Sequence, residues 1–229
     1  MSAAEETIGT GRGDTPPRRG VVFDLGSVLV RVDIDDFEQL AGSVGASLDE
    51  VVVVLVGDYA DDNDHPFHRA ERGEVTLAAA LEDIETLARQ RGFSIEPIRQ
   101  QLLHPTVEIN RELLDEVAGL RERGWRTGVI TNSVLEYSEI IAGLLPWDDL
   151  FDIVVDSSQV GIRKPDHRIF ARALELLDLE PEHVVFIDDQ PGNVAAAARL
   201  GMRTIRADRF DAIAGQLREL VQAWTGDKR

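Results

Sequence analysis

The chain of 229 residues contains no cysteine, which excludes a disulfide scaffold and a metal site built from thiolates. It also lacks a long apolar run: the longest, residues 51–56, is far shorter than the ~20 residues that cross a bilayer. No apolar stretch of a secretory signal stands at the N-terminus, and the absence of cysteine fits a reducing compartment. We therefore expect a cytoplasmic protein without a membrane partner.

Positive charge is in the minority. Lysine and arginine total 24 against 42 aspartate and glutamate residues, which gives a formal net charge of −18. This charge repels the phosphate backbone of nucleic acids and the surface of anionic membranes, so we expect no nucleic acid partner. It would also repel a small phosphorylated substrate, so a site for such a substrate must supply its own positive charge.

Residues 1–20 hold several glycines and prolines and no periodic apolar pattern, so we predict a flexible leader there. After the leader, short apolar runs alternate with helical patterns. Strands are predicted at residues 21–23, 125–131, 151–155, 183–187 and 202–205. Such alternation is typical of an α/β fold, in which helices cover both faces of a parallel sheet.

The segment from about 34 to 104 interrupts this alternation and contains no predicted strand. Its helices are separated by breaks near Gly45, Pro66, Gly73 and Gly92. Thr76 is the predicted N-cap of one of them, and Gly73 is interpreted as a helix C-cap. We interpret residues 33–105 as a helical domain inserted into a core formed by 21–32 and 106–229.

Polar side chains stand where the predicted strands end and in one loop between a strand and a helix. In chain order they are Asp24, Thr131, Asn132, Lys164, Asp188 and Asp189. Because open α/β sheets bind ligands at the carboxyl ends of their strands, these residues form one site if their strands are neighbours.

The chemistry of this set points to a metal ion and to phosphate. Three carboxylates within ~5 Å cannot all stay ionised without a cation, because like charges raise one another's pKa. Oxygen ligands without histidine or cysteine suit a hard ion, most simply Mg²⁺. A carboxylate can serve as a covalent nucleophile. Charge on a phosphoryl group would be balanced by Mg²⁺, Lys164, the Thr131 hydroxyl and the N–H groups of a helix expected after Asn132.

Four segments resemble the ordered motifs of the haloacid dehalogenase (HAD) superfamily. They are FDLGSVLV at 23–30, VITN at 129–132, RKP at 163–165 and FIDDQPGN at 186–193. The resemblance extends from residue 21 to about 224 and implies a Rossmann-like core with a helical cap over the active site. The Phe-Asp-Leu-Gly form of the first motif resembles a bacterial sugar-phosphatase branch that includes α-glucose-1-phosphate phosphatase.

The resemblance implies a role for each matching residue near the metal. Asp24 matches the nucleophile, which is also a metal ligand, and Gly26 matches the residue whose backbone carbonyl binds Mg²⁺. Asp189 matches the direct acidic ligand. Asp188 beside it would either bind the metal or hold a metal-bound water.

The resemblance also implies how phosphate is bound, and it shows one departure. Thr131 and Asn132 match the phosphate-binding pair, and Lys164 matches the lysine that balances charge. Phosphatases of this superfamily usually carry a second aspartate two residues after the nucleophile, which protonates the leaving group. This chain has Gly26 there, so the general acid is unassigned, and Asp33 is the first alternative to test.

The cap residues His65, His68, Arg69 and Arg72 stand at near-helical spacing. A solvated helix face is expected for most of them, and contact with substrate is the alternative. The acidic residues outside the motifs are expected to lie on the surface.

Taken together, the sequence predicts a Mg²⁺-dependent phosphatase that acts on a small phosphorylated metabolite, with a sugar phosphate as the expected class. One alternative is a 2-haloacid dehalogenase, which needs no metal; the acidic pair at Asp188 and Asp189 argues against it. The other is a catalytically weak or inactive binding protein, because of Gly26. The sequence makes no prediction of the oligomeric state.

Overall fold

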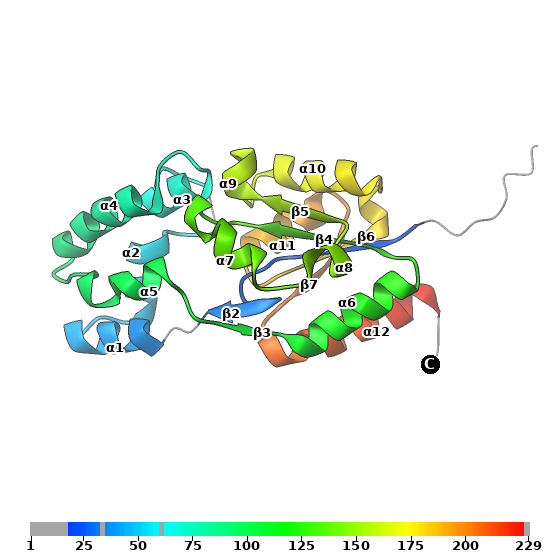
Figure 1. The fold of residues 1–229 in the computed structure, drawn as a ribbon, viewed down its shortest axis with the longest axis horizontal. Helices are drawn as coiled ribbons and strands as arrows, with labels where there is room; N and C mark the ends of the chain where they lie inside the picture. Colours follow the sequence, from blue (N-terminus) through cyan, green and yellow to red (C-terminus); the bar gives the residue numbers. More distant parts are fainter. Residues whose placement is uncertain (1–17, 33–34, 60–61, 227–229) are drawn as a thin grey trace, which may run out of the picture.

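The computed structural model describes residues 18–32, 35–59 and 62–226. A parallel sheet of five strands in the order β5-β4-β1-β6-β7 forms the centre of the core (Figure 1). The strands are β1 (Gly20–Phe23), β4 (Arg126–Thr131), β5 (Ile153–Asp156), β6 (Val184–Asp188) and β7 (Arg203–Arg206). All five predicted strands are confirmed, with ends that differ by at most two residues. The predicted leader lies almost wholly outside the described residues.

Helices cover both faces of this sheet, as the sequence predicts. One face packs against α6 (Arg111–Glu122) and α12 (Ile213–Thr225), and the other against α10 (His167–Leu177) and α11 (Pro191–Arg199). The side chains of β1 show why helices must pack on both faces of the sheet. Its alternate side chains serve different layers: Val21 and Phe23 pack with the first helix pair, and Val22 packs with the second.

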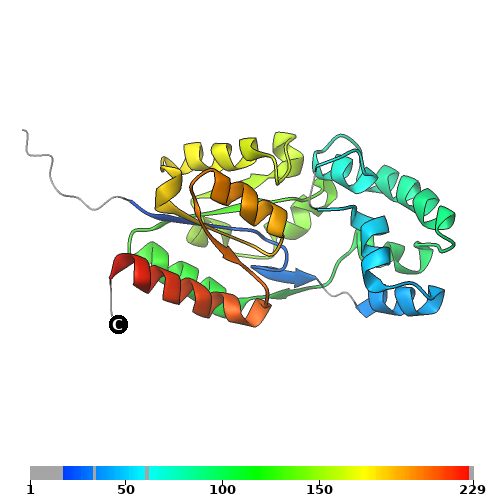
Figure 2. The ribbon, with the colours of Figure 1, turned by 180° about the vertical axis from the view of Figure 1, so that it is seen from behind.

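The cap is a separate helical unit with a hydrophobic core of its own (Figure 2). It contains α1 (Asp35–Val44), α2 (Leu48–Val56), α3 (Pro66–Glu71), α4 (Leu77–Gln90), the 3₁₀ helix η1 (Glu96–Ile98) and α5 (Arg99–Leu103). Thr76 accepts a hydrogen bond from the backbone N–H of Ala79 and is the N-cap of α4, as predicted. The all-helical prediction for this segment is confirmed in the residues that the structure describes.

A small second sheet lies where the chain passes between core and cap. β2 (Val30–Val32) and β3 (Val107–Ile109) pair antiparallel, with Val30 opposite Ile109. Neither strand is predicted from the sequence. Three residues are too few to display the alternation that identifies a strand, and the two partners are far apart in sequence.

The segment after β4 is less regular than predicted. In place of one helix it forms the 3₁₀ helix η2 (Leu135–Tyr137), α7 (Ser138–Ala142) and α8 (Trp147–Leu150). The remaining short elements are α9 (Ser157–Val160), η3 (Pro181–His183) and η4 (Phe210–Ala212).

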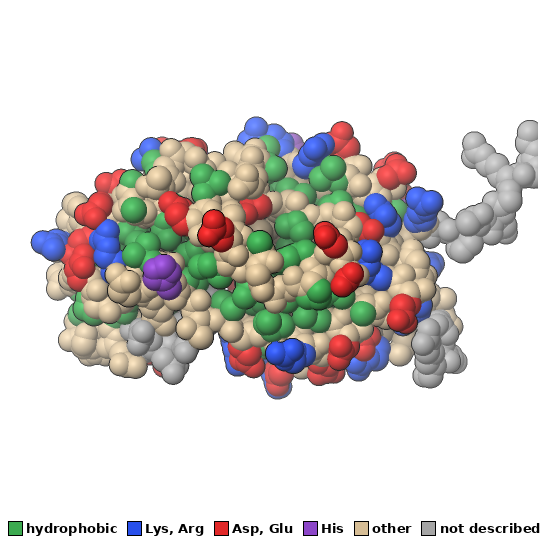
Figure 3. Space-filling view, viewed as in Figure 1, with side chains coloured by type: hydrophobic (Ala, Val, Ile, Leu, Met, Phe, Trp, Pro, Cys, Tyr) green, Lys and Arg blue, Asp and Glu red, His purple; other side chains and the backbone are tan. Residues whose placement is uncertain are grey.

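On the side drawn in Figure 3, acidic and basic side chains are interspersed, and no large basic patch is visible. Within the described residues, no single helix is long and apolar enough to span a membrane. One pair bent by 115°, Phe37–Val44 with Leu48–Val56, passes that test by length and composition together.

Candidate active site

Three neighbouring strands bring the site residues together. β4, β1 and β6 lie side by side and in parallel, so their carboxyl ends meet at one edge of the sheet. Asp24 directly follows β1, Thr131 ends β4 and Asp188 ends β6. The expected adjacency of these strands is therefore confirmed.

Lys164 joins two of the carboxylates. Its ammonium Nζ donates to Asp24 Oδ1 at 2.6 Å, to Asp188 Oδ2 at 2.7 Å and to the carbonyl of Ile130 at 3.0 Å. Asn132 fixes the loop that carries this lysine: its Oδ1 accepts from the Lys164 N–H at 2.8 Å and its Nδ2 donates to the Lys164 carbonyl at 3.0 Å. The Asn132 side chain thus positions the lysine backbone.

Oxygen atoms of Asp24, Asp188 and Asp189 lie within 4.8 Å of one another. Asp188 is fully buried and held on several sides, since it also accepts from Asn193 Nδ2 at 3.0 Å and from the Gln190 N–H at 2.8 Å. The Asp189 carboxylate accepts a side-chain hydrogen bond from Gln190 Nε2 at 2.8 Å. Asp189 therefore has more free coordinating capacity than Asp188.

The cluster holds more acidic groups than basic ones, and burial together with mutual repulsion disfavours the charged form of its carboxyl groups. Burial is the main cause that raises the pKa of Asp24, opposed by Lys164 and reinforced by Asp188 and Asp189. Burial also raises the pKa of Asp189, and the charge of Asp188 adds to it. For Lys164, burial opposes the charged form, but Asp188 and Asp24 outweigh it and raise the lysine's pKa. One ammonium faces three carboxyl groups, and a cation among them would favour their charged forms.

A pocket of about 190 Å³ opens beside these carboxylates. It is lined by Asp24, Gly26, Ser27, Tyr59, Asn132, Lys164, Asp189, Gln190 and Asn193. Two predicted site residues lie behind this lining. Asp188 is 0% exposed, and the Thr131 side chain is buried at the end of β4. The pocket is therefore bounded by five of the seven residues that the sequence analysis selected.

Gly26 lies in the pocket wall, where the sequence departs from the usual phosphatase motif. A Cβ atom added to Gly26 would meet no other atom within 4 Å, so the site has room for a small side chain at this position. Asp33, the alternative acid, lies outside the described residues.

The helix N-terminus expected after Asn132 is absent, and that expectation is wrong. Residues 133 and 134 have no regular secondary structure, and the 3₁₀ helix η2 begins only at Leu135. The Ser133 N–H donates to Ser157 Oγ at 3.0 Å, so it already has a partner within the protein.

Several buried polar residues at the boundary between cap and core were missed. His68 was expected on a solvated face and Glu71 on the surface, but they are 0% and 1% exposed. Arg163 is fully buried too, and Arg72 is 12% exposed and ion-paired with Asp62. These expectations are wrong because the contacts that bury the side chains are not visible in the local pattern: Glu71 pairs with Arg163, 92 residues away along the chain, and His68 packs against other ring side chains of the cap. The sequence pattern of the charged residues around Arg72 is also typical of a solvent-exposed helix.

Comparison with known proteins places this site in a family. The family model "haloacid dehalogenase-like hydrolase" matches residues 19–201. The mouse protein "Acyl-CoA dehydrogenase family member 10" is 30% identical over 212 residues, which is 89% of this chain and 19% of that protein. The curated relatives matched first are much longer than the chain, which spans 19–38% of their length.

Solved structures give the same result for the fold. A predicted HAD-like family hydrolase from Porphyromonas gingivalis is 28% identical with a TM-score of 0.63, over 90% of this chain and 98% of that one. A HAD family enzyme from Bacteroides thetaiotaomicron, solved with magnesium and inorganic phosphate, is 22% identical with a TM-score of 0.62, over 84% and 96%. With the family model over most of its length and the motifs gathered at one sheet edge, the chain belongs to the haloacid dehalogenase-like hydrolases.

Proposed function

We propose that this hydrolase is a Mg²⁺-dependent phosphatase that acts on a small phosphorylated metabolite through an aspartyl-phosphate. The observation that carries the proposal is the cluster of three carboxylates around one buried lysine, at the mouth of a small pocket. That arrangement combines a carboxylate nucleophile with a site for a hard cation, and phosphoryl transfer needs both.

The donor set fits magnesium. The described carboxylate cluster of Asp24, Asp188 and Asp189 offers oxygen atoms only, and the family motif adds the backbone carbonyl of Gly26. Asp189 is the better direct ligand of the acidic pair, because Asp188 is already held by Lys164 and Asn193. When bound, Mg²⁺ would neutralise negative charge on the phosphoryl group.

The chain's own residues then account for two steps. Asp24 attacks phosphorus in line, a new bond forms between its carboxylate oxygen and phosphorus, and the bond to the leaving oxygen breaks. Lys164 stays charged beside Asp24 and balances the phosphoryl oxygens. A water next attacks phosphorus of the aspartyl-phosphate, which releases inorganic phosphate and regenerates Asp24. Thr131 and Asn132 are assigned to the phosphate side of the pocket by their matching motif.

Gly26 favours particular substrates. A glycine cannot protonate the departing oxygen, and general acid catalysis contributes ~10²–10⁴-fold, most for poor leaving groups. An enzyme without this acid should prefer leaving oxygens that are already stabilised. The anomeric oxygen of a sugar 1-phosphate is less basic than the primary oxygen of a 6-phosphate. We therefore assign anomeric sugar phosphates as the preferred substrates.

A cytoplasmic location stays a prediction from the cysteine-free sequence.

The metal-independent dehalogenase is the less favoured candidate. Its chemistry has no need of Asp189, which would add a buried negative charge to the site without a counterion. An inactive binding protein is disfavoured by the buried contact of Lys164 with Asp24, which holds a nucleophile and its counterion together at 2.6 Å.

Release of inorganic phosphate from p-nitrophenyl phosphate tests the proposal. We expect turnover that requires Mg²⁺ and that Asp24→Asn abolishes, with residual activity below ~1% of wild type, because covalent catalysis contributes orders of magnitude. Equal turnover with and without chelator, or a fully active Asp24→Asn, would contradict it. Release of chloride from 2-chloropropionate instead of phosphate would favour the dehalogenase.

A further inference from the structure

A buried ion pair joins the cap to the core beside the active site. Arg163 Nε donates to Glu71 Oε2 at 2.7 Å, and the two side chains are 0% and 1% exposed. Arg163 precedes Lys164 in the catalytic loop, whereas Glu71 ends helix α3 of the cap. The pair therefore connects the residue next to the catalytic lysine with the inserted domain.

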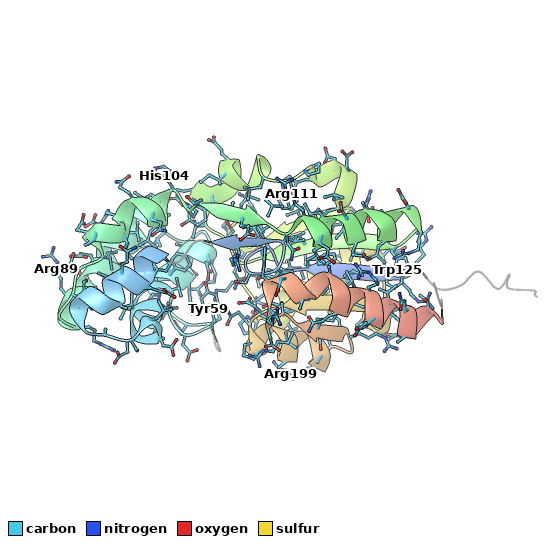
Figure 4. The ribbon with its side chains drawn as sticks, turned by 90° about the horizontal axis from the view of Figure 1, so that it is seen from below. Tyr59, Arg89, His104, Arg111, Trp125 and Arg199 are labelled. Atoms are coloured by element: carbon cyan, nitrogen blue, oxygen red, sulfur yellow. The ribbon has the colours of Figure 1, made fainter. Side chains whose placement is uncertain are left out.

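The second oxygen of Glu71 holds a side chain of the pocket wall. The Tyr59 hydroxyl donates to Glu71 Oε1 at 3.0 Å, and the Arg163 guanidinium lies 5.2 Å from the centre of the Tyr59 ring. Tyr59 lines the same pocket as Asp24. It is the only residue of the cap that does so within the part of the chain that the structure describes, and Figure 4 shows it at the junction of cap and core.

The backbones of the two domains also approach closely here. Gly73, two residues after Glu71, has φ +68°, and a Cβ there would lie 2.5 Å from the carbonyl oxygen of Ser158 in α9. A larger residue would push the cap away from the core. This close contact restricts the position of α3 on the core, and the hydrogen bond to Glu71 ties Tyr59 to α3.

Stability alone gives a weak reason for this pair. Taking two charges out of water is costly, and apolar residues of the same volume often serve stability as well. Moreover, Nη1 and Nη2 of Arg163 make no hydrogen bond within the described residues, and Nη1 lies 3.6 Å from the Asp62 carboxylate. Buried donors without a hydrogen bond cost stability, so the pair is not explained by stability alone.

We propose that Tyr59 contacts the leaving group of the substrate, and that Glu71 and Arg163 are positioning residues that hold its phenol in the pocket wall. The inference rests on the proposed phosphatase function. In-line attack by Asp24 places the leaving oxygen on the far side of phosphorus, and the cap contributes Tyr59 to that pocket. Since the phenol proton is donated to Glu71, Tyr59 offers a ring and an acceptor oxygen. It suits sugar or aryl groups and is a recognition residue rather than the missing acid.

Two probe substrates with different leaving groups test the contact. p-Nitrophenyl phosphate carries an aryl ring that can reach Tyr59, whereas the acetyl group of acetyl phosphate is small. We expect Tyr59→Ala to lower kcat/KM for p-nitrophenyl phosphate at least tenfold more than for acetyl phosphate, mainly through KM. An unchanged ratio between the two substrates would overturn the contact.

Tyr137 supplies a matched control. Its hydroxyl donates to the carbonyl of Leu102, so it too is a phenol hydrogen-bonded between core and cap, but it does not line the pocket. Tyr137→Phe should leave the ratio of kcat/KM for the two substrates within twofold of wild type. A shift as large as that of Tyr59→Ala would mean that loosening the cap alone explains the effect, and would overturn the specific role of Tyr59.

A test of the positioning role of Glu71 and Arg163 requires a variant that folds. Glu71→Gln alone would leave Arg163 buried without its counterion, so the variant of choice is Glu71→Leu with Arg163→Met, which removes both charges. If this double variant unfolds cooperatively, we expect the same change in substrate ratio as in Tyr59→Ala. A wild-type ratio in the folded double variant would overturn the positioning role.

Failure of the proposed function is separable from failure of this inference. It would appear as no phosphate release from either probe by the wild type. Calorimetric titration with glucose 1-phosphate then compares Tyr59→Ala with Tyr137→Phe without turnover. We expect at least tenfold weaker binding to Tyr59→Ala, and equal affinities would overturn the contact.

Discussion

The adjacent acids Asp188 and Asp189 share a sequence motif but differ in their surroundings. Asp188 is fully buried and accepts hydrogen bonds from Lys164, Asn193 and the Gln190 backbone, whereas Asp189 lines the pocket and accepts one from Gln190. These surroundings support our proposal that Asp189 is the direct metal ligand and that Asp188 is held chiefly by its protein partners; the sequence motif left the role of Asp188 open.

We expect Asp189→Ala to raise the Mg²⁺ concentration needed for half-maximal activity at least tenfold. Asp188→Ala should change that concentration less but reduce thermal stability more, because Lys164 and Asn193 would lose a buried partner. Mg²⁺ titrations of activity and thermal unfolding of both variants are the measurements. Equal or reversed effects on the Mg²⁺ requirement would contradict the ranking.

The open space at Gly26 allows the missing acid to be introduced by substitution. We expect Gly26→Asp to increase kcat/KM for glucose 6-phosphate more than for glucose 1-phosphate, because an added acid helps the poorer leaving group. The wild type should prefer the 1-phosphate. A series of aryl phosphates of graded leaving-group basicity completes the measurement. If the wild type hydrolyses both sugar phosphates equally well, another residue supplies the proton, and Asp33 is the first to substitute.

At the scale of elements, repeated local patterns were predictable and contacts between domains were not. The five core strands and the N-cap at Thr76 follow from buried apolar runs and capping chemistry within a few residues. Asp24, Lys164 and the acidic pair follow from strand ends and a family motif. The three-residue strands β2 and β3 carry too little pattern. The buried ion pair of Glu71 is with Arg163, 92 residues away along the chain.

His68 in helix α3 makes the free energy of unfolding depend on pH. Burial, together with the charge of Arg163, lowers the pKa of His68 to about 3, so its ring is neutral in the folded state. In the unfolded chain the pKa is about 6.5, so the unfolded state binds an extra proton below that pH. The stability contribution is therefore present above pH ~6.5 and is lost as the pH falls toward 3.

We expect the free energy of unfolding of the wild type to fall by about 1 kcal/mol more than that of His68→Phe between pH 7 and pH 5.5. Urea unfolding at the two pH values gives this difference, with His104→Phe at an exposed position as control. The control should follow the wild type. Parallel losses in wild type and His68→Phe would show that His68 is not buried in its neutral form.

At the scale of the whole molecule, the net charge of −18 opposes the approach of an anionic substrate. Salt screens this repulsion, since the Debye length falls from ~30 Å at 0.01 M to ~10 Å at 0.1 M ionic strength. We expect kcat/KM for p-nitrophenyl phosphate to rise about twofold or more over this range, at fixed Mg²⁺ saturation. A fall would mean that the local charge at Lys164 dominates the encounter.

The proposed mechanism requires that Asp24 becomes covalently phosphorylated during turnover, and this intermediate can be trapped. The wild type is mixed with p-nitrophenyl phosphate and Mg²⁺, quenched in acid within a single turnover, digested, and examined by mass spectrometry. We expect one phosphoryl group on the peptide that contains Asp24, absent from Asp24→Asn and from samples without Mg²⁺. Phosphate release at the wild-type rate with that peptide unmodified, or with the phosphoryl group on another residue, would contradict it.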